Sequence, residues 1–528
     1  MPEQPPLDPL DRAVPRQATT PSAYGMSSAP ELGQTVLPGG DLVYAGPAEP
    51  ARRSRLGMVI GALATAIVVT LGVGAYAAVT LNGGGRQPET LVPSTAFAFA
   101  KLDLDPAASQ KLAVRELADK FPSAPEGEID EMFDELLREA LQDYEDVDFD
   151  RDIDPWLGKR IGIAGFLDSS GAPGVLGVIQ SADDDKARPA LARLAADDPD
   201  AAYLLRDGYV LVAADQESLA LAVDQLGDGS LADSDEYADD VDALTGDQIL
   251  TAWVDVARAF DATESQLGEE GQEVFPESLR EQLKGRVAMG VHAASDYLEV
   301  EAVSSDPGSA GLSGAYPTII GDLPASTVVA FSANGVGEQL DEALDAFGTL
   351  PGAELPSRQE IADEVESAFG LDLDADLLPL LANQVVLALG AVPDFSGEEI
   401  PEIALLSLVT DPARAAKTAS KIEDLARERG APLRSQVRGS TFFLATDGGY
   451  LGRLTTPQGR LADAPRFRRA VGELDDSVVF VGYADLRELL TLLDDSEEAA
   501  EAKALAAVGL RAELRDGRAV FRMRVTVE

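Results

Sequence analysis

The fold of this chain is decided by Asp148-Phe-Asp-Arg-Asp-Ile-Asp-Pro-Trp-Leu157 and its echo Asp372-Leu-Asp-Ala-Asp-Leu-Leu-Pro-Leu-Leu381. Each stretch is followed at once by an apolar run, 160–166 in the first case and 384–390 in the second. Similar segments repeated at a long spacing are typical of duplicated structural units. The sequence therefore predicts two copies of one unit.

Further pairs of similar segments occur in the same order on both sides of residue 310 or so. They are 91–97 with 323–329, 178–183 with 406–411, 206–208 with 437–439, 231–233 with 461–463, 249–255 with 479–485, and 290–293 with 509–512. Their collinear order predicts a first repeat at 89–305, a linker at 306–321 and a second repeat at 322–528. A Gly-rich spacer, 82–88, precedes the first repeat.

Two periodicities alternate within each copy. In the first repeat, apolar/polar alternation or short apolar runs predict strands at 95–105, 160–166, 174–181, 201–206, 209–213, 249–256, 286–294 and 298–303. Apolar residues at helical spacing predict helices at 106–121, 128–142, 185–195, 216–226 and 276–284. The turns Asp207-Gly208 and Asp516-Gly517 favour hairpins. We therefore expect an α+β fold, with a mainly antiparallel sheet and helices on one face.

Charge and composition exclude several classes of function. The 528 residues include 42 Lys+Arg and 92 Asp+Glu, giving a net charge of −50, with one His and no Cys. This charge disfavours binding to nucleic acid or to anionic headgroups, and the lack of Cys excludes thiol nucleophiles, disulfides and Cys-based metal sites. Phosphate-loop, HExxH and GxSxG motifs are absent from the sequence. We expect no cofactor and identify no catalytic residue.

The N-terminal part predicts a membrane anchor. Residues 1–51 are rich in Pro, Gly, Ser and Thr without any period, which is typical of a disordered tail. Residues 56–81 form an uncharged run that is longer than the roughly 20 residues needed to cross a bilayer. Arg52, Arg53 and Arg55 directly precede the run, which places the tail in the cytoplasm and the repeats outside.

Two other properties of this run stay open. Ala75-Tyr76-Ala77 has the form of a signal-peptidase site, but the leader before the run is long for a signal peptide. Gly57 and Gly61 have the small-xxx-small spacing that lets helices approach, which is compatible with a weak homodimer through this helix.

Acidic residues at alternate positions are the candidate cation ligands. They are Asp148, Asp150 and Asp152 in the first copy and Asp372, Asp374 and Asp376 in the second. Carboxylate oxygens suit calcium, but the EF-hand pattern fails because its glycine and final glutamate positions hold Arg151 and Leu157. A solvated acidic stretch is the alternative, and we predict no metal site.

Three other conspicuous side chains are predicted to be structural. His292 aligns with Arg511 in the second copy, which indicates a tolerant position rather than a catalytic one. Trp156 and Trp253 align with large apolar residues and are expected to anchor the core.

At Leu91–Phe97, Lys101–Pro106, Lys111-Leu112 and Asp154–Arg160, the chain resembles an uncharacterised family of single-pass membrane proteins from high-GC Gram-positive bacteria. The resemblance spans most of 56–528. It implies a cytoplasmic tail, one membrane span and an exported part, and it implies no activity. The second copy has Pro379-Leu-Leu-Ala382 where the first has Pro-Trp-Leu-Gly, which suggests that this motif serves packing.

The sequence thus predicts a membrane-anchored, extracytoplasmic, non-enzymatic protein that binds or scaffolds an unknown protein or ligand of the cell envelope. The cleft between the copies is the default ligand site. One alternative is a carrier or sensor of a lipid or other apolar envelope molecule. Another is an envelope hydrolase that acts through paired carboxylates.

Overall fold

The computed structural model describes residues 86–103, 108–121, 138, 148–167, 172–195, 202–267, 284–306, 318–347, 356–391, 400–492 and 502–528. It also describes β1 (Thr35–Val36) and β2 (Leu42–Val43), a short antiparallel pair in the predicted tail. The chain separates into the units Met1–Arg53 and Ser54–Glu528. None of the described helices has the length and apolar character to cross a membrane. The predicted span 56–81, with Gly57 and Gly61, lies outside the described residues.

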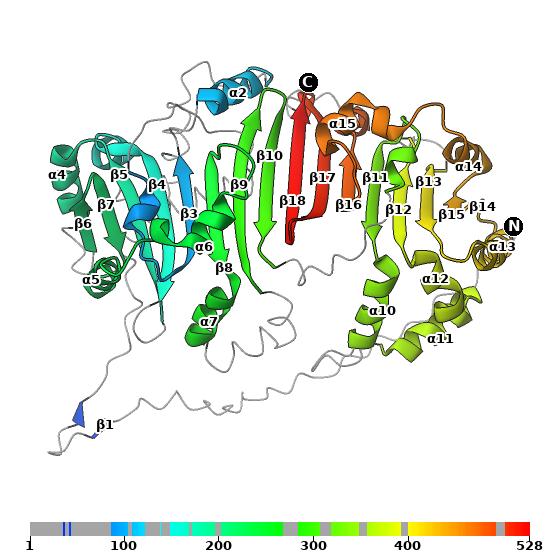
Figure 1. The fold of residues 1–528 in the computed structure, drawn as a ribbon, viewed down its shortest axis with the longest axis horizontal. Helices are drawn as coiled ribbons and strands as arrows, with labels where there is room; N and C mark the ends of the chain where they lie inside the picture. Colours follow the sequence, from blue (N-terminus) through cyan, green and yellow to red (C-terminus); the bar gives the residue numbers. More distant parts are fainter. Residues whose placement is uncertain are drawn as a thin grey trace, which may run out of the picture. The chain divides into compact units, whose positions relative to one another are not determined.

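Both repeats contribute eight strands to one antiparallel sheet of 16 strands (Figure 1). From the junction outward, the first repeat contributes β10 (Tyr297–Ser304), β9 (Arg286–Ala294), β8 (Leu250–Asp255), β3 (Ala96–Asp103), β4 (Leu157–Leu167), β5 (Pro173–Ser181), β7 (Tyr209–Ala213) and β6 (Ala202–Arg206). The second contributes β18 (Arg518–Val527), β17 (Leu505–Arg515), β16 (Val478–Ala484), β11 (Val329–Asn334), β12 (Gln384–Leu389), β13 (Ile403–Leu408), β15 (Thr441–Ala445) and β14 (Arg434–Arg438). The two strand orders are the same, which confirms the predicted duplication.

The helices also correspond in pairs. The α-helical pairs are α2 (Ala108–Ala118) with α10 (Val336–Phe347), α4 (Asp184–Ala195) with α13 (Pro412–Glu428), α5 (Gln216–Gln225) with α14 (Gly448–Thr455), α6 (Asp235–Val241) with α15 (Pro465–Val471), and α7 (Val256–Leu267) with α16 (Leu486–Leu489). Short turns pair likewise: η1 (Pro88–Leu91) with η5 (Ile320–Asp322), η2 (Phe149–Ile153) with η6 (Leu373–Leu377), and η3 (Leu231–Asp233) with η7 (Leu461–Asp463). The described part of the second repeat also contains α11 (Arg358–Phe369), α12 (Leu378–Leu381) and η8 (Leu490–Leu492).

Helices cover both faces of the sheet, so the prediction of helices on one face is wrong. In the first repeat, α2 and α4 pack into one buried cluster, whereas α5 and α6 pack into another. Strand β7 shows the reason, because it is buried along its whole length. Its Val210 and Val212 belong to the first cluster and its Leu211 to the second. A continuous apolar run of this kind is typical of a strand covered on both sides.

Two tight turns have the backbone that their sequences predicted. Asp207 and Gly208 have φ of 54° and 78°, and Asp516 and Gly517 have φ of 52° and 76°. Two consecutive residues with positive φ make the hairpin turn that Asp-Gly favours. The hairpins β6–β7 and β17–β18 are therefore confirmed.

Other predictions are confirmed with shifted ends or lie outside the described residues. The predicted helix 106–121 appears as α2, and the predicted strand 95–105 appears as β3. The helix α7 directly follows β8 and was not predicted. Predicted helices 128–142 and 276–284, and most of the linker 306–321, fall outside the described residues, apart from residues 138 and 284.

Candidate functional site

The candidate site is centred where the repeats meet, at strands β10 and β18. These strands lie side by side and pair antiparallel (Figure 1). Glu299 lies opposite Arg524, and Glu301 lies opposite Arg522. Successive side chains of a strand point to opposite faces, so all four charged side chains lie on one face. Val300 and its neighbours at alternate positions lie on the other face. The junction thus has a charged face and an apolar face.

We name six residues of the charged face the junction network: Glu299, Glu301, Arg511, Glu513, Arg522 and Arg524. The side chains of the three glutamates are 1%, 0% and 0% exposed. Arg522 Nη2 donates to Glu301 Oε1 at 2.7 Å, and Nη1 donates to Glu513. Arg524 Nε donates to Glu299. Each buried carboxylate therefore has a guanidinium partner, as buried charges require.

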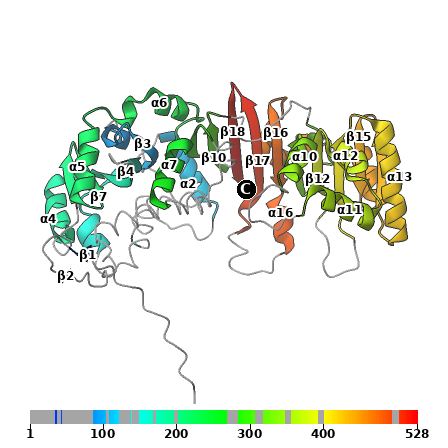
Figure 2. The same ribbon diagram turned by 90° about the horizontal axis from the view of Figure 1, so that it is seen from below.

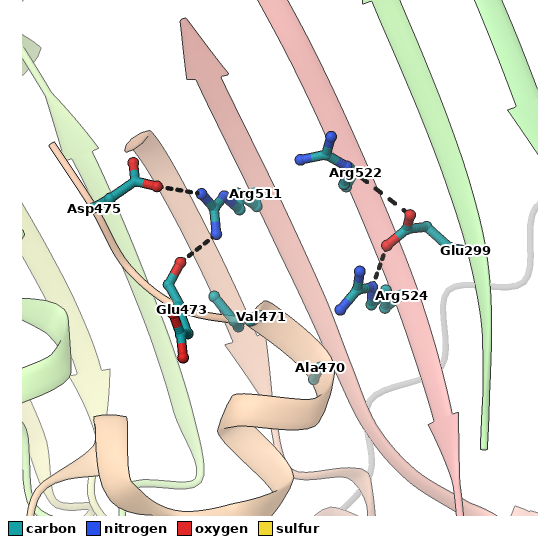
Figure 3. Close-up of a pocket in the computed structure, with 9 residues that line it drawn as sticks. Glu299, Ala470, Val471, Glu473, Asp475, Arg511, Arg522 and Arg524 are labelled. Atoms are coloured by element: carbon teal, nitrogen blue, oxygen red, sulfur yellow. Dashed lines mark hydrogen bonds and ion pairs between the residues drawn. The ribbon is translucent and has the colours of Figure 1, made fainter. Parts of the chain in front are cut away.

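A pocket of about 260 Å³ lies beside the junction network (Figure 3). It is lined by Glu299, Ala470, Val471, Gly472, Glu473, Asp475, Arg511, Arg522 and Arg524. Arg511 donates to the Glu473 carbonyl, and its Nη2 lies 3.3 Å from Asp475 Oδ2. Glu299 comes from the first repeat and the other residues from the second, so joining of the repeats completes the pocket. Guanidinium and carboxylate groups suit a polar ligand. The pocket lies at the junction of the two copies, where a ligand-binding cleft was expected.

His292 extends the charged face into the first repeat. It is buried, and its Nε2 lies 3.5 Å from Glu299 Oε1. Trp253 and Tyr483 occupy equivalent positions in the two repeats, and they pair with Ala288 in β9 and Gly509 in β17. Four residues further along these two strands lie His292 and Glu513. The counterpart of His292 is therefore Glu513 rather than Arg511. The sequence alignment was displaced by two residues, and such a slip keeps a strand residue on the same face.

Burial lowers the pKa of His292 below its ordinary value of 6.5, against the opposing effect of Glu299 and Glu301. Arg524 and Arg522 lower the pKa further. The folded state thus takes up the imidazole proton at lower pH than the unfolded state does. We expect the free energy of unfolding to fall as the pH drops through 6.5 toward the folded-state pKa.

Because the chain has one His, labelled histidine gives a single NMR titration. Its midpoint should lie below 6.5 in the folded protein. His292→Gln should reduce the stability difference between about pH 7 and about pH 5. A midpoint above the ordinary value would contradict this expectation.

The opposite, apolar face is continuous across eight neighbouring strands. Register pairs connect three rows of side chains from β13 to β9. They are Ile403, Leu389, Val329, Ala484, Val508, Val525, Leu298 and Ala293; Leu405, Leu387, Phe331, Gly482, Leu510, Met523, Val300 and Val291; and Ser407, Val385, Ala333, Phe480, Ala512, Phe521, Ala302 and Met289. No residue of these rows is charged, and Ser407 is their one polar residue.

The row that contains Leu405 and Val291 is covered at both ends, and the middle of the face is partly exposed. Leu405 packs in the cluster under α12 and α13, and Val291 packs in the cluster under α2 and α4. Between them lies the part that we name the central apolar face: Phe331, Leu387, Phe480, Val508, Leu510, Phe521, Met523 and Val525. Phe331, Leu387 and Phe521 are 43%, 49% and 40% exposed. Figure 2 shows β17 and β18 between the helices of the two repeats. An uncharged exposed surface of this extent is typical of an interaction site.

The predicted cation candidates form two local turns instead of one site. Asp148 accepts a hydrogen bond from the backbone of Arg151 at the start of η2, and Asp372 does the same for Ala375 at the start of η6. Asp150 pairs with Arg138 at 2.8 Å, and Asp374 pairs with Arg358 at 2.6 Å. Across the described parts of the chain, no group of three or more His, Cys, Asp or Glu could hold a metal ion.

Asp152 and Asp376 are the buried members of these turns. Burial alone raises the pKa of Asp152, but hydrogen bonds from Arg151, the Asp148 backbone and Arg193 outweigh it, so the net pKa lies below the ordinary value. Asp376 has the same balance, with Lys421 as its main partner. Both carboxylates therefore stay ionised as structural acceptors.

The two repeats differ in packing beside these turns. Trp156 is buried in the first repeat and donates from Nε1 to the Asp152 carbonyl at 2.6 Å. Leu380 takes its place in the second repeat and borders a pocket of about 240 Å³. Trp156 and Trp253 are both buried, as predicted for core anchors.

Sequence analysis did not identify the junction network. A signal was present, because Glu299 and Glu301 alternate in a predicted strand, and Arg522 and Arg524 alternate near the C-terminus. Opposite charges facing each other stabilise paired strands. The sequence alone did not show that these two segments pair.

The described fold and junction define a duplicated α+β protein. The chain belongs to the DUF3352 family, described as protein of unknown function, which matches residues 60–202 and 195–441 in tandem. No match is found among curated proteins. A solved structure, "Structure of crystal form III of TP0453", is 6% identical and covers 42% of this chain and 81% of its own, with a TM-score of 0.21. This value is too low to indicate a shared fold.

Proposed function

We propose that this protein is a membrane-anchored, extracytoplasmic binding protein that acts without catalysis in the cell envelope. The central apolar face carries this proposal. It is uncharged, three of its side chains are exposed, and it spans five neighbouring strands of the second repeat. The anchor itself rests on the predicted span 56–81 and its preceding arginines.

This face favours an apolar envelope molecule over a polar partner as the ligand. Removing exposed apolar area from water is favourable, and none of the residues in the three rows of this face is charged. The pocket carboxylates Glu299 and Asp475 form ion pairs with Arg524 and Arg511. This arrangement favours binding over glycoside hydrolysis, which needs one carboxyl group free to donate a proton to the leaving group.

The absence of native Cys allows a direct test in intact cells. Leu387→Cys should be protected from a membrane-impermeant maleimide because a ligand covers the central apolar face. Ser420→Cys, on the exposed surface of α13, should be labelled in the same cells. Ser27→Cys, in the predicted cytoplasmic tail, should be labelled only after lysis.

After detergent purification, Leu387→Cys should become reactive. Equal labelling of Leu387→Cys and Ser420→Cys in cells would show a free face and overturn the binding proposal. Protection that persists in the purified chain would show that the chain covers its own face, which also overturns it. Labelling of Ser27→Cys before lysis would overturn the orientation.

A further inference from the structure

We propose that the central apolar face binds acyl chains of phospholipid from the adjacent membrane, an inference that rests on the proposed function. Its shape fits such a ligand. The face crosses five neighbouring strands from β12 to β18, which at about 4.8 Å per strand gives about 19 Å. Three rows along each strand give about 13 Å. An extended acyl chain of a phospholipid has a comparable length.

Charge favours a lipid over a second copy of this chain as the ligand of the central apolar face. A second copy of this chain would bring another net charge of −50 against the first, and such self-repulsion opposes association. Acyl chains carry no charge and need no hydrogen-bond partner. They match the row that runs from Phe331 through Gly482 and Leu510 to Met523 without a polar residue in register.

The length of the tether places lipid within reach. The predicted span ends at Leu81, and the described fold begins with η1 at Pro88. The residues between them extend over at most about 3.6 Å each, or roughly 25 Å in all. The fold is therefore held near the bilayer, where phospholipid is the abundant apolar molecule. The tail 1–51 is predicted on the other side of the membrane and cannot cover this face.

The test uses the full chain in phosphatidylcholine vesicles that contain a phosphatidylcholine with a photoreactive diazirine at the end of one acyl chain. After illumination, cross-linked peptides should map to β11, β12 and β16 to β18 as well as to 56–81. The span serves as an internal control for insertion. Phe331→Asp and Leu387→Asp should each lower cross-linking of the sheet by roughly tenfold, with cross-linking of 56–81 unchanged.

Leu204→Asp is the matched control, because Leu204 is similarly exposed but lies on the edge strand β6 and the opposite face. It should leave sheet cross-linking unchanged. Leu387→Gln, which adds no charge, gives a second reading if an Asp variant unfolds by circular dichroism.

Cross-linking confined to 56–81, with Leu387→Cys still protected in cells, would overturn the lipid assignment and leave the binding proposal standing. Disulfide-linked dimers of Leu387→Cys would assign the face to a second copy and overturn it too. Equal labelling of Leu387→Cys and Ser420→Cys in cells would show that the face is free and would overturn both proposals.

Discussion

Replacing Arg522 with methionine is expected to lower the free energy of unfolding by about 3–5 kcal/mol. Arg522 is the one side chain of the junction network that contacts buried carboxylates of both repeats, Glu301 in the first and Glu513 in the second. Without its guanidinium, Glu301 keeps a buried charge whose partner is lost. Methionine retains much of the volume, so the effect reports charge more than packing. Chemical denaturation of the full chain measures the change.

Arg515→Met is the matched control. Arg515 also contacts Glu513, at 2.8 Å, but its side chain is 51% exposed. Water screens such a contact, so the loss should be about 1 kcal/mol or less. The double variant Arg522→Met with Glu301→Gln should recover part of the stability, because it removes the unpaired charge. Equal losses for Arg522→Met and Arg515→Met would show that the buried network does not join the repeats.

The sequence predicts the parts of this fold that depend on neighbouring residues. Hairpins at Asp207-Gly208 and Asp516-Gly517 follow from local backbone preference, and strands such as β4 and β12 follow from apolar runs. The duplication follows from internal similarity. The pairing of β10 with β18 does not, because it joins segments more than two hundred residues apart in the sequence. Local periodicity contains no information on such partners.

The candidate site was predictable only in part, for two physical reasons. Alternating aspartates look alike in a cation loop and in a capped turn, and the difference lies in distant partners such as Arg193 and Lys421. The central apolar face also left no local signal. The apolar sequences of its strands are typical of ordinary core strands. Phe331 and Leu387 are exposed only because of the arrangement of the helices in space.

Replacing Trp156 with leucine is expected to cost about 3–5 kcal/mol of the free energy of unfolding. Trp156 is 1% exposed and lies among the buried side chains under α4. The substitution removes an indole from a packed core and leaves the Asp152 carbonyl without its 2.6 Å hydrogen bond. The variant thus imitates the second repeat, where Leu380 borders a pocket.

The reciprocal variant, Leu380→Trp, tests whether this position serves only for packing in the second repeat or whether the second repeat requires the pocket beside it. The indole has room in the pocket of about 240 Å³, which is bordered by Pro379, Ala382 and Ala415. Filling such space with apolar atoms should leave stability unchanged or raise it by about 1 kcal/mol. Thermal unfolding of both variants and of the parent chain measures the two changes in stability. The assignment of Trp156 as a core anchor would be contradicted if Leu380→Trp lost much stability and Trp156→Leu lost little. That result would mean that the smaller Leu380 is not an incomplete substitute for tryptophan.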